Sequence, residues 1–227
     1  MSEAQTSLSI RERLEQVEDR IETAARRAGR ARSEITLVAV TKKFDAAVMR
    51  EAYDAGLRRF GENYVQEFEG KYPALKDLTD AEFHLIGHLQ SNKARAAGEL
   101  FQVIQTVDSE KLARRLDQVG RVLEVMIEVK LSEEETKAGA AAETLAGLIE
   151  GIRGCGNLRL TGLMTMPPWC EDPEVTRPYF RRLAGLAREH GLAKLSMGMS
   201  HDLEAAIEEG ATHVRVGTAL FGPRKKA

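Results

Sequence analysis

Two adjacent lysines, Lys42 and Lys43, end an apolar run and have the chemistry of a covalent site. The run LVAV, residues 37–40, is typical of a buried strand. A lysine amine becomes a nucleophile toward carbonyl compounds when burial or a neighbouring cation lowers its pKa. Strand alternation places Lys42 on the face of Val38 and Val40 and Lys43 on the other face, but both faces are apolar, so the pattern does not choose between them. The alternative for either lysine is a strand-end side chain that extends into solvent.

A second group of residues, near the C-terminus, has the types that bind phosphate. SMGMS supplies a glycine and the hydroxyl of Ser200, and VRVGTALFG supplies Gly217 and Thr218. In (β/α)8 barrels the loops after strands seven and eight bind phosphate through backbone N–H groups. The alternative is that Ser200 only caps its helix and Gly217 only forms a tight turn. Their occurrence after adjacent predicted strands favours phosphate, and a lysine across the barrel mouth then indicates a phosphorylated carbonyl ligand held as a Schiff base.

Eight short apolar runs alternate with helical segments along the chain. The runs are ITLVAV, RRFGEN, FHLIG, VIQTVD, EVMIEVK, LRLTGLMTM, AKLSMG and HVRVG. Strict alternation predicts a parallel sheet covered by helices, and eight repeats favour a closed barrel over an open doubly wound sheet. We therefore predict an α/β fold: a single (β/α)8 TIM-type barrel over residues 35–222 with an extra N-terminal helix within residues 1–30, forming one domain over residues 1–227.

Two segments stand outside the repeats. Apolar residues recur every three to four positions from Ile10 to Ile21, which predicts an amphipathic helix over Ser7–Ala28 that ends near Gly29. MPPWCEDPEVTRP, residues 166–178, holds four of the six prolines. We interpret it as a long loop between a strand and a helix, on the rim where barrels build their sites.

The composition excludes several classes of protein. The 33 basic and 35 acidic residues leave a net charge of −2, so neither nucleic acid nor a membrane surface is an expected partner. The two cysteines, Cys155 and Cys170, form no framework, and no signal peptide or long apolar stretch is evident. We expect a soluble cytoplasmic protein. His84 and His88 have no Cys or Glu at metal-ligand spacing, so no metal site is expected.

The order of the motifs resembles that of a known family. AVTK, FGENYVQE, FHLIGHLQSNK, GLMTM and SMGMSHDLEAAIEEGATHVRVGTALFG are similar to the pyridoxal-phosphate homeostasis proteins, whose fold resembles the N-terminal barrel of alanine racemases. The resemblance runs from about Ile10 to Gly222. It implies a carrier of pyridoxal 5′-phosphate (PLP), bound as a Schiff base on Lys42 and used in vitamin B6 homeostasis.

The same resemblance assigns the other site residues. It implies that the phosphate is held by Ser200, Gly217 and Thr218, that Arg215 faces the pyridine nitrogen, and that Asn63 and Met164 line the ring. The family continues after its lysine with Thr, Lys and often Pro, whereas this chain has Lys43, Phe44 and Asp45. Lys137 matches a family lysine, with a solvated loop lysine as the alternative. The segment GENYVQEF indicates a helix start with Glu62 or Asn63 as its cap.

A carrier rather than an enzyme is expected for two reasons. An arginine, always protonated, leaves the ring nitrogen opposite it unprotonated, and such a ring is a poor electron sink. Alanine racemases also have an arginine here, so this reason alone does not exclude racemisation, and the second reason is the stronger. Only ALFGPRKKA follows the eighth strand, whereas racemases of this fold add a β-domain that delivers a second base. The rivals are a PLP-dependent amino-acid racemase-like enzyme and a Schiff-base aldolase acting on a sugar phosphate. We expect a monomer whose partners are PLP and apo PLP-dependent enzymes.

Overall fold

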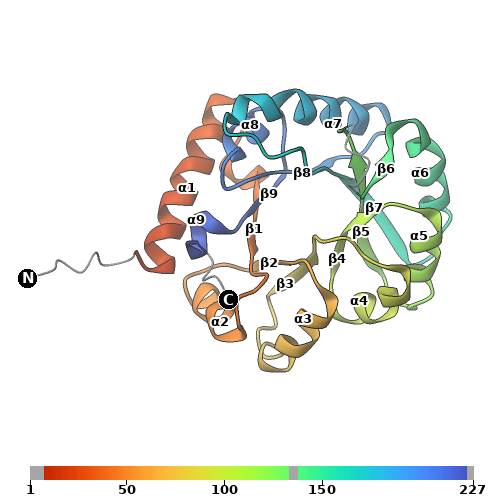
Figure 1. The fold of residues 1–227 in the computed structure, drawn as a ribbon, viewed down its shortest axis with the longest axis horizontal. Coiled ribbons are helices and arrows are strands. Elements are labelled where there is room, and N and C mark those ends of the chain that lie inside the picture. The colour runs from red at the N-terminus through yellow and green to blue at the C-terminus, as the bar shows by residue number, and fades with distance from the viewer. Residues whose placement is uncertain (1–7, 133–137, 224–227) are drawn as a thin grey trace, which may run out of the picture.

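The computed structural model describes residues 8–132 and 138–223, in which eight parallel strands close into a barrel (Figure 1). The strands are β1 Thr36–Val40, β2 Arg59–Glu62, β3 Glu82–Leu85, β4 Val103–Val107, β5 Leu123–Lys130, β7 Leu158–Met164, β8 Lys194–Met199 and β9 His213–Val216. They pair in the order β4-β3-β2-β1-β9-β8-β7-β5, and a pairing of β4 with β5 closes the ring. All eight strands predicted from the apolar runs are confirmed, and so is the closed barrel.

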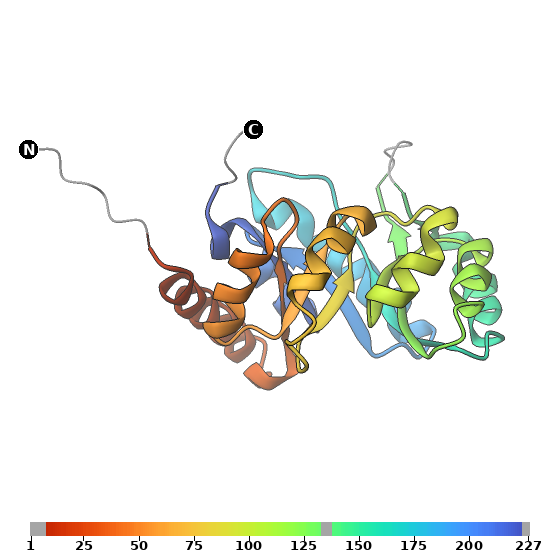
Figure 2. The ribbon, with the colours of Figure 1, turned by 90° about the horizontal axis from the view of Figure 1, so that it is seen from below.

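Helices surround the barrel, as Figures 1 and 2 show. They are α1 Ile10–Arg27, α2 Ala46–Asp54, α3 Val65–Lys71, α4 Ala94–Leu100, α5 Glu110–Asp117, α6 Leu145–Arg153, α7 Arg177–Glu189, α8 Leu203–Glu208 and α9 Thr218–Phe221. The additional helix α1 begins with a capping box formed by Ser9 and Glu12, and the chain leaves it at Gly29, whose φ is 67°. The predicted N-terminal helix is therefore present, with its first turn starting slightly later than expected.

One short strand was not predicted. Strand β6, Ala140–Ala141, pairs in parallel with the end of β5, and a 3₁₀ turn over 142–144 then leads into α6. This stretch lies outside the eight apolar runs from which strands were predicted. Two alanines carry too little pattern to reveal a strand, because their pairing depends on where β5 ends rather than on their own side chains.

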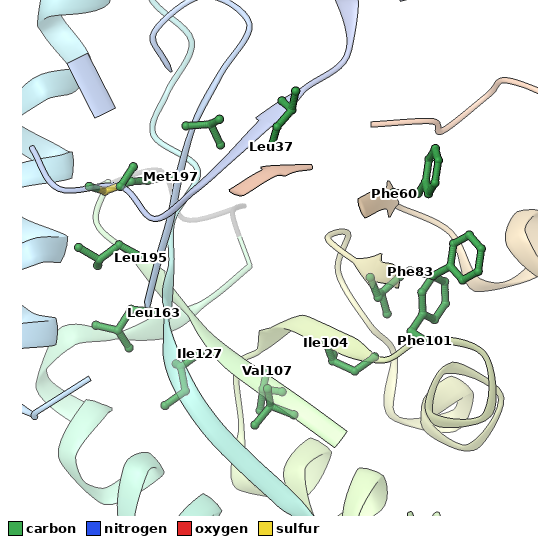
Figure 3. Packing of buried hydrophobic residues seen from close by; sticks show 14 of the residues in the cluster. Leu37, Phe60, Phe83, Phe101, Ile104, Val107, Ile127, Leu163, Leu195 and Met197 are labelled. Carbon is green, nitrogen blue, oxygen red and sulfur yellow. The ribbon is translucent and has the colours of Figure 1, made fainter. Parts of the chain in front are cut away.

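The core lies between the outward faces of the strands and the helices (Figure 3). The labelled strand side chains Phe60, Phe83 and Leu163 are all at most 3 % exposed. Phe68 of α3 packs with its ring centroid 4.8 Å from that of Phe83 and 4.7 Å from that of Phe101. Aromatic contacts at this separation fix the helix layer on the barrel in addition to the area they bury.

The side chains inside the barrel are more polar than those that the strands direct toward the helices. His84, Gln105, Ser196 and Arg215 are all buried there, on strands β3, β4, β8 and β9. Barrel interiors are ordinarily filled by branched apolar side chains. No helix in the described ranges is both long and apolar enough to span a membrane, and no cluster in those ranges has three side chains suited to a metal ion.

We expect the close approach of β7 and β8 to make Gly162 intolerant of any side chain. A Cβ built there would lie 2.0 Å from the backbone oxygen of Lys194, and backbone cannot move aside cheaply. Gly162→Ala should lower the unfolding free energy by roughly 2 kcal/mol or more, measured by urea denaturation. The control is Gly185→Ala in α7, where a Cβ meets nothing within 4 Å, and it should stabilise by about 0.5–1 kcal/mol. Equal effects would contradict the contact.

The buried imidazole of His213 predicts a loss of stability in acid. Burial is the main cause that lowers its pKa from the ordinary 6.5 to about 3. The folded protein therefore keeps His213 neutral at pH values where the unfolded chain protonates it. Stability should be unaffected by this group above pH about 6.5 and fall below it, by at most about 1.4 kcal/mol per pH unit.

Denaturant unfolding between pH 7 and 4.5 measures this effect. His213→Gln removes the titrating group and should flatten the decline, although the hydrogen bond between Thr212 Oγ1 and His213 Nδ1 at 2.8 Å is also lost. That loss lowers stability at every pH and leaves the slope unaffected. The interpretation is wrong if wild type and variant lose stability with the same slope.

Candidate functional site

A cavity of about 530 Å³ opens at the end of the barrel where the strands terminate. Six of the seven predicted site residues line it: Lys42, Asn63, Ser200, Arg215, Gly217 and Thr218. Met164 does not. It is fully buried in β7, and Met166, two residues further on, lines the cavity instead. Strand β7 ends at Met164, so the residue that reaches the cavity belongs to the loop that follows the strand.

The two lysines lie in one tight turn, which gives their side chains different surroundings. The N–H of Phe44 donates to the carbonyl of Thr41 at 3.1 Å, so Lys42 and Lys43 are the central residues of a β-turn. Lys43 has a φ of 66°, and the carboxylate of Glu67 accepts its backbone N–H at 2.5 Å. Its side chain is exposed, while Lys42 is half-buried at the cavity. The geometry thus distinguishes two residues that strand alternation alone left equivalent.

A buried ion pair between Glu62 and Lys71 holds Thr41, the first residue of this turn. The carboxylate of Glu62 accepts from Thr41 Oγ1 at 2.8 Å and from Lys71 Nζ at 2.9 Å. Lys71 also donates to the carbonyl of Thr41 at 3.1 Å and pairs with Glu67 at 2.6 Å. Burial raises the pKa of Glu62, and the charge of Lys71 opposes that rise. The backbone that carries Lys42 is therefore fixed by charges as well as by strand pairing.

The expected capping role of Glu62 or Asn63 is wrong. The residue before α3 is Tyr64, with no side-chain cap, and Glu62 is occupied with Thr41 and Lys71. Asn63 lines the cavity instead, and its Oδ1 is buried with no hydrogen-bond partner among the described residues. A Cβ on Gly87 would lie 2.3 Å from the carbonyl oxygen of Asn63, so glycine is required for the loop to hold Asn63 here.

Ser200, Gly217 and Ala219 meet in the wall of the cavity, after strands β8 and β9. The N–H groups of Gly217 and Ala219 donate to Ser200 Oγ at 3.2 and 3.3 Å. Ser200 does not cap α8, since that helix begins at Leu203 with Asp202 before it. Two backbone donors and two hydroxyls, those of Ser200 and Thr218, therefore converge where an anion could be bound.

Arg215 lies inside the barrel, next to this group of hydroxyls and backbone N–H donors, which we call the phosphate-type cup. The residue is only 3 % exposed, and its guanidinium donates to Ser196 Oγ at 2.6 Å and to the carbonyl oxygen of Thr165 at 2.9 Å. Burial lowers the pKa of Arg215 to about 10, and the negative charges of Glu128 and Asp202 oppose this shift. Arg215 is thus a cation at neutral pH and presents only donors to the cavity.

The walls of the cavity are largely apolar. They include Val40, Ile86, Met166, Trp169 and Met199. Met166 and Trp169 belong to the proline-rich loop between β7 and α7, which the structure confirms as a strand-to-helix connection. Neither residue was predicted from the sequence to line the site. The sequence placed this loop on the rim of the barrel, where such walls are built. It does not indicate which side chains of the loop turn toward the cavity.

Four other residues considered from the sequence, two histidines and two cysteines, do not line the cavity. His84 is buried inside the barrel, and His88 is half-exposed with its Nδ1 3.5 Å from Asp108. Cys155 and Cys170 are thiols that form no disulfide. Lys137 lies outside the described residues.

Comparison with known proteins places this chain in a family. The model described as the N-terminal domain of alanine racemase matches residues 13–225. A protein named pyridoxal phosphate homeostasis protein in Aquifex aeolicus is 47 % identical, covering 94 % of this chain and 98 % of that protein. Its namesake in Pseudomonas aeruginosa is 46 % identical, covering 95 % and 96 %. The chain belongs to the pyridoxal phosphate homeostasis protein family. The family predicted from the motifs is therefore confirmed, and the relatives carry a name for homeostasis rather than for a catalysed reaction.

Solved structures agree with this family. PipY of Synechococcus elongatus, solved without PLP, is 39 % identical with a TM-score of 0.84, covering 94 % of this chain and all of that one. The structure of PipY with PLP bound has a TM-score of 0.82 at the same identity and coverage. Alanine racemase of Corynebacterium glutamicum has a TM-score of 0.66 at 19 % identity, covering 94 % of this chain and 62 % of that one. The racemase shares the barrel fold alone, whereas the homeostasis proteins share the sequence as well.

The left-handed backbone at Lys43 predicts opposite effects for two substitutions in this family member. Lys43→Gly removes the steric cost of φ near +66° and should raise the unfolding free energy by up to about 1 kcal/mol. Lys43→Val adds a β-branched side chain there and should lower it by about 1–2 kcal/mol. Lys76→Val, at another exposed lysine, is the control and should stay within about 0.5 kcal/mol. Indistinguishable values for the two Lys43 variants in urea denaturation would contradict the turn.

Proposed function

We propose that this protein binds pyridoxal 5′-phosphate as a Schiff base on Lys42 and acts in intracellular vitamin B6 homeostasis as a carrier or buffer. In this proposal it works as a cytoplasmic monomer that releases PLP to apo PLP-dependent enzymes. The observation that carries the proposal is one cavity holding the Lys42 amine, the phosphate-type cup at Ser200 and the buried cation Arg215. Relatives named for PLP homeostasis and a PLP-bound neighbour support it.

The residues of the cavity fit the three parts of PLP. The hydroxyl of Ser200, the N–H groups of Gly217 and Ala219 and the hydroxyl of Thr218 would hold the phosphate. Apolar side chains such as Ile86 provide walls for a flat ring. The buried, unpartnered Oδ1 of Asn63 shows that the amide is not satisfied by the described residues, which suits a side chain that contacts a ligand.

Lys42 would supply the covalent bond. Its amine would add to the aldehyde carbon, with a C=N bond replacing C=O and the carbonyl oxygen leaving with two protons as water. Addition of water reverses the step and releases the aldehyde. The turn fixed by Glu62, Glu67 and Lys71 would hold the Lys42 backbone at the cavity during both steps.

Arg215 favours storage over catalysis. PLP, when bound, can stabilise a carbanion by drawing electrons into a protonated pyridine ring. Arg215 is a donor held in place by Ser196 and Thr165, so a ring nitrogen opposite it would accept a hydrogen bond and stay unprotonated. The cofactor would then be held tightly while its reactivity toward an amino-acid α-carbon stays low.

We predict that borohydride reduction of the PLP-loaded protein attaches the pyridoxyl group to Lys42. Peptide mapping by mass spectrometry measures the position. Trp169 is the single tryptophan in the chain and lines the cavity, so its fluorescence should fall on loading and report occupancy independently. Lys42→Ala should abolish both the modification and the visible absorption, and with them the transfer of PLP to an apo-enzyme.

Lys43→Ala is the matched control, because it removes an adjacent exposed lysine from the same turn and should leave loading unchanged. Modification at Lys43 in place of Lys42 would overturn the assignment. Measurable turnover of alanine or another amino acid would favour a racemase-like enzyme, and trapping only in the presence of a sugar phosphate would favour an aldolase.

A further inference from the structure

A line of hydrogen bonds runs from Arg215 through the interior of the barrel to its opposite end. Arg215 Nη1 lies 2.6 Å from Ser196 Oγ, Ser196 Oγ lies 2.6 Å from Gln105 Oε1, Gln105 Nε2 lies 2.9 Å from His84 Nδ1, and His84 Nε2 lies 2.8 Å from Glu82 Oε1. The first four residues are at most 3 % exposed, whereas the Glu82 side chain is 43 % exposed. Side chains from β9, β8, β4 and β3 are thus joined into one chain.

The hydrogen bonds of this chain all run in the same direction, away from Arg215. A guanidinium only donates, so Ser196 Oγ accepts from Arg215, and the single hydroxyl proton of Ser196 goes to Gln105 Oε1. The amide NH₂ of Gln105 then faces His84 Nδ1, which must accept. The remaining ring proton is on Nε2 and is donated to the carboxylate of Glu82. In this arrangement each of the first four residues donates a hydrogen bond to the next.

Arg215 depends on this chain for its placement. Its guanidinium has two protein acceptors, Ser196 Oγ and the carbonyl oxygen of Thr165, and it forms no ion pair with any residue in the described ranges. The carbonyl is fixed by the backbone, but a serine hydroxyl can rotate. It is the acceptor Gln105 Oε1, itself oriented by His84, that holds the hydroxyl with its lone pairs toward Arg215.

We propose that Ser196 and Gln105 are positioning residues that hold the Arg215 guanidinium toward the ring nitrogen of the bound cofactor. The inference rests on the proposed function, in which that ring lies against Arg215. Neither residue touches the cofactor: both act through Arg215. Loss of either acceptor lets the guanidinium turn, and the hydrogen bond to the ring nitrogen weakens while the bond to Lys42 stays intact.

The test uses PLP labelled with nitrogen-15 at the pyridine nitrogen, bound to the full-length protein. The chemical shift of that nitrogen reports its hydrogen bond directly and does not depend on any activity. Ser196→Ala and Gln105→Leu should both move the shift toward the value of an unbonded pyridine, and PLP should dissociate about tenfold faster, which corresponds to about 1.4 kcal/mol. Ser196→Thr retains the hydroxyl and should restore the wild-type shift.

Controls separate this role from simple packing. Met126→Leu alters the buried interior of β5 without removing a hydrogen bond and should leave the shift unchanged. Circular dichroism and borohydride labelling of Lys42 establish that each variant is folded and loaded. Wild-type shifts in both loaded Ser196→Ala and Gln105→Leu would overturn the inference and leave the proposed function standing. Failure of the wild type to take up PLP on Lys42 would overturn both.

Discussion

The buried guanidinium of Arg215 is the constraint around which the inside of this barrel is arranged. Removing a charge from water costs several kcal/mol unless hydrogen bonds and opposite charges compensate. Here Ser196 and the Thr165 carbonyl supply the hydrogen bonds, while Glu128 and Asp202 compensate the charge from a greater distance. A polar interior follows, in place of the branched apolar layers usual in such barrels.

The frame around this interior was predictable because its signals are local. The eight barrel strands and the helical segments between them follow from runs of apolar residues, and the closed ring follows from the count of eight repeats. The rim residues Lys42, Ser200 and Arg215 were then placed together by the rule that the carboxyl ends of parallel strands meet at one side. The family resemblance assigned their roles, and the structure supplies a cavity that contains all three.

What the sequence could not supply are contacts between side chains far apart in the chain. Glu62 and Lys71 fix the Lys42 turn, yet the pattern offered Glu62 only as a helix cap, because the ion pair exists only after α3 has packed on β2. Gln105 and Ser196 are 91 positions apart and meet across the barrel. Met164 is buried at the end of β7 and Met166 of the following loop lines the cavity, because the residue that reaches a cavity depends on where its strand ends.

The one-way order of donors inside the barrel also constrains how this chain can change by mutation. The amide at 105 accepts from a hydroxyl at 196 through Oε1 and donates to a ring nitrogen at 84 through Nε2, so its two hydrogen bonds depend on both neighbours. Replacing one member alone leaves a buried donor or acceptor unpaired, at a cost of about 1–3 kcal/mol. We therefore expect these three positions, which are distant in the sequence, to be inherited and lost as a set, while the exposed turn residue at 43 can vary independently.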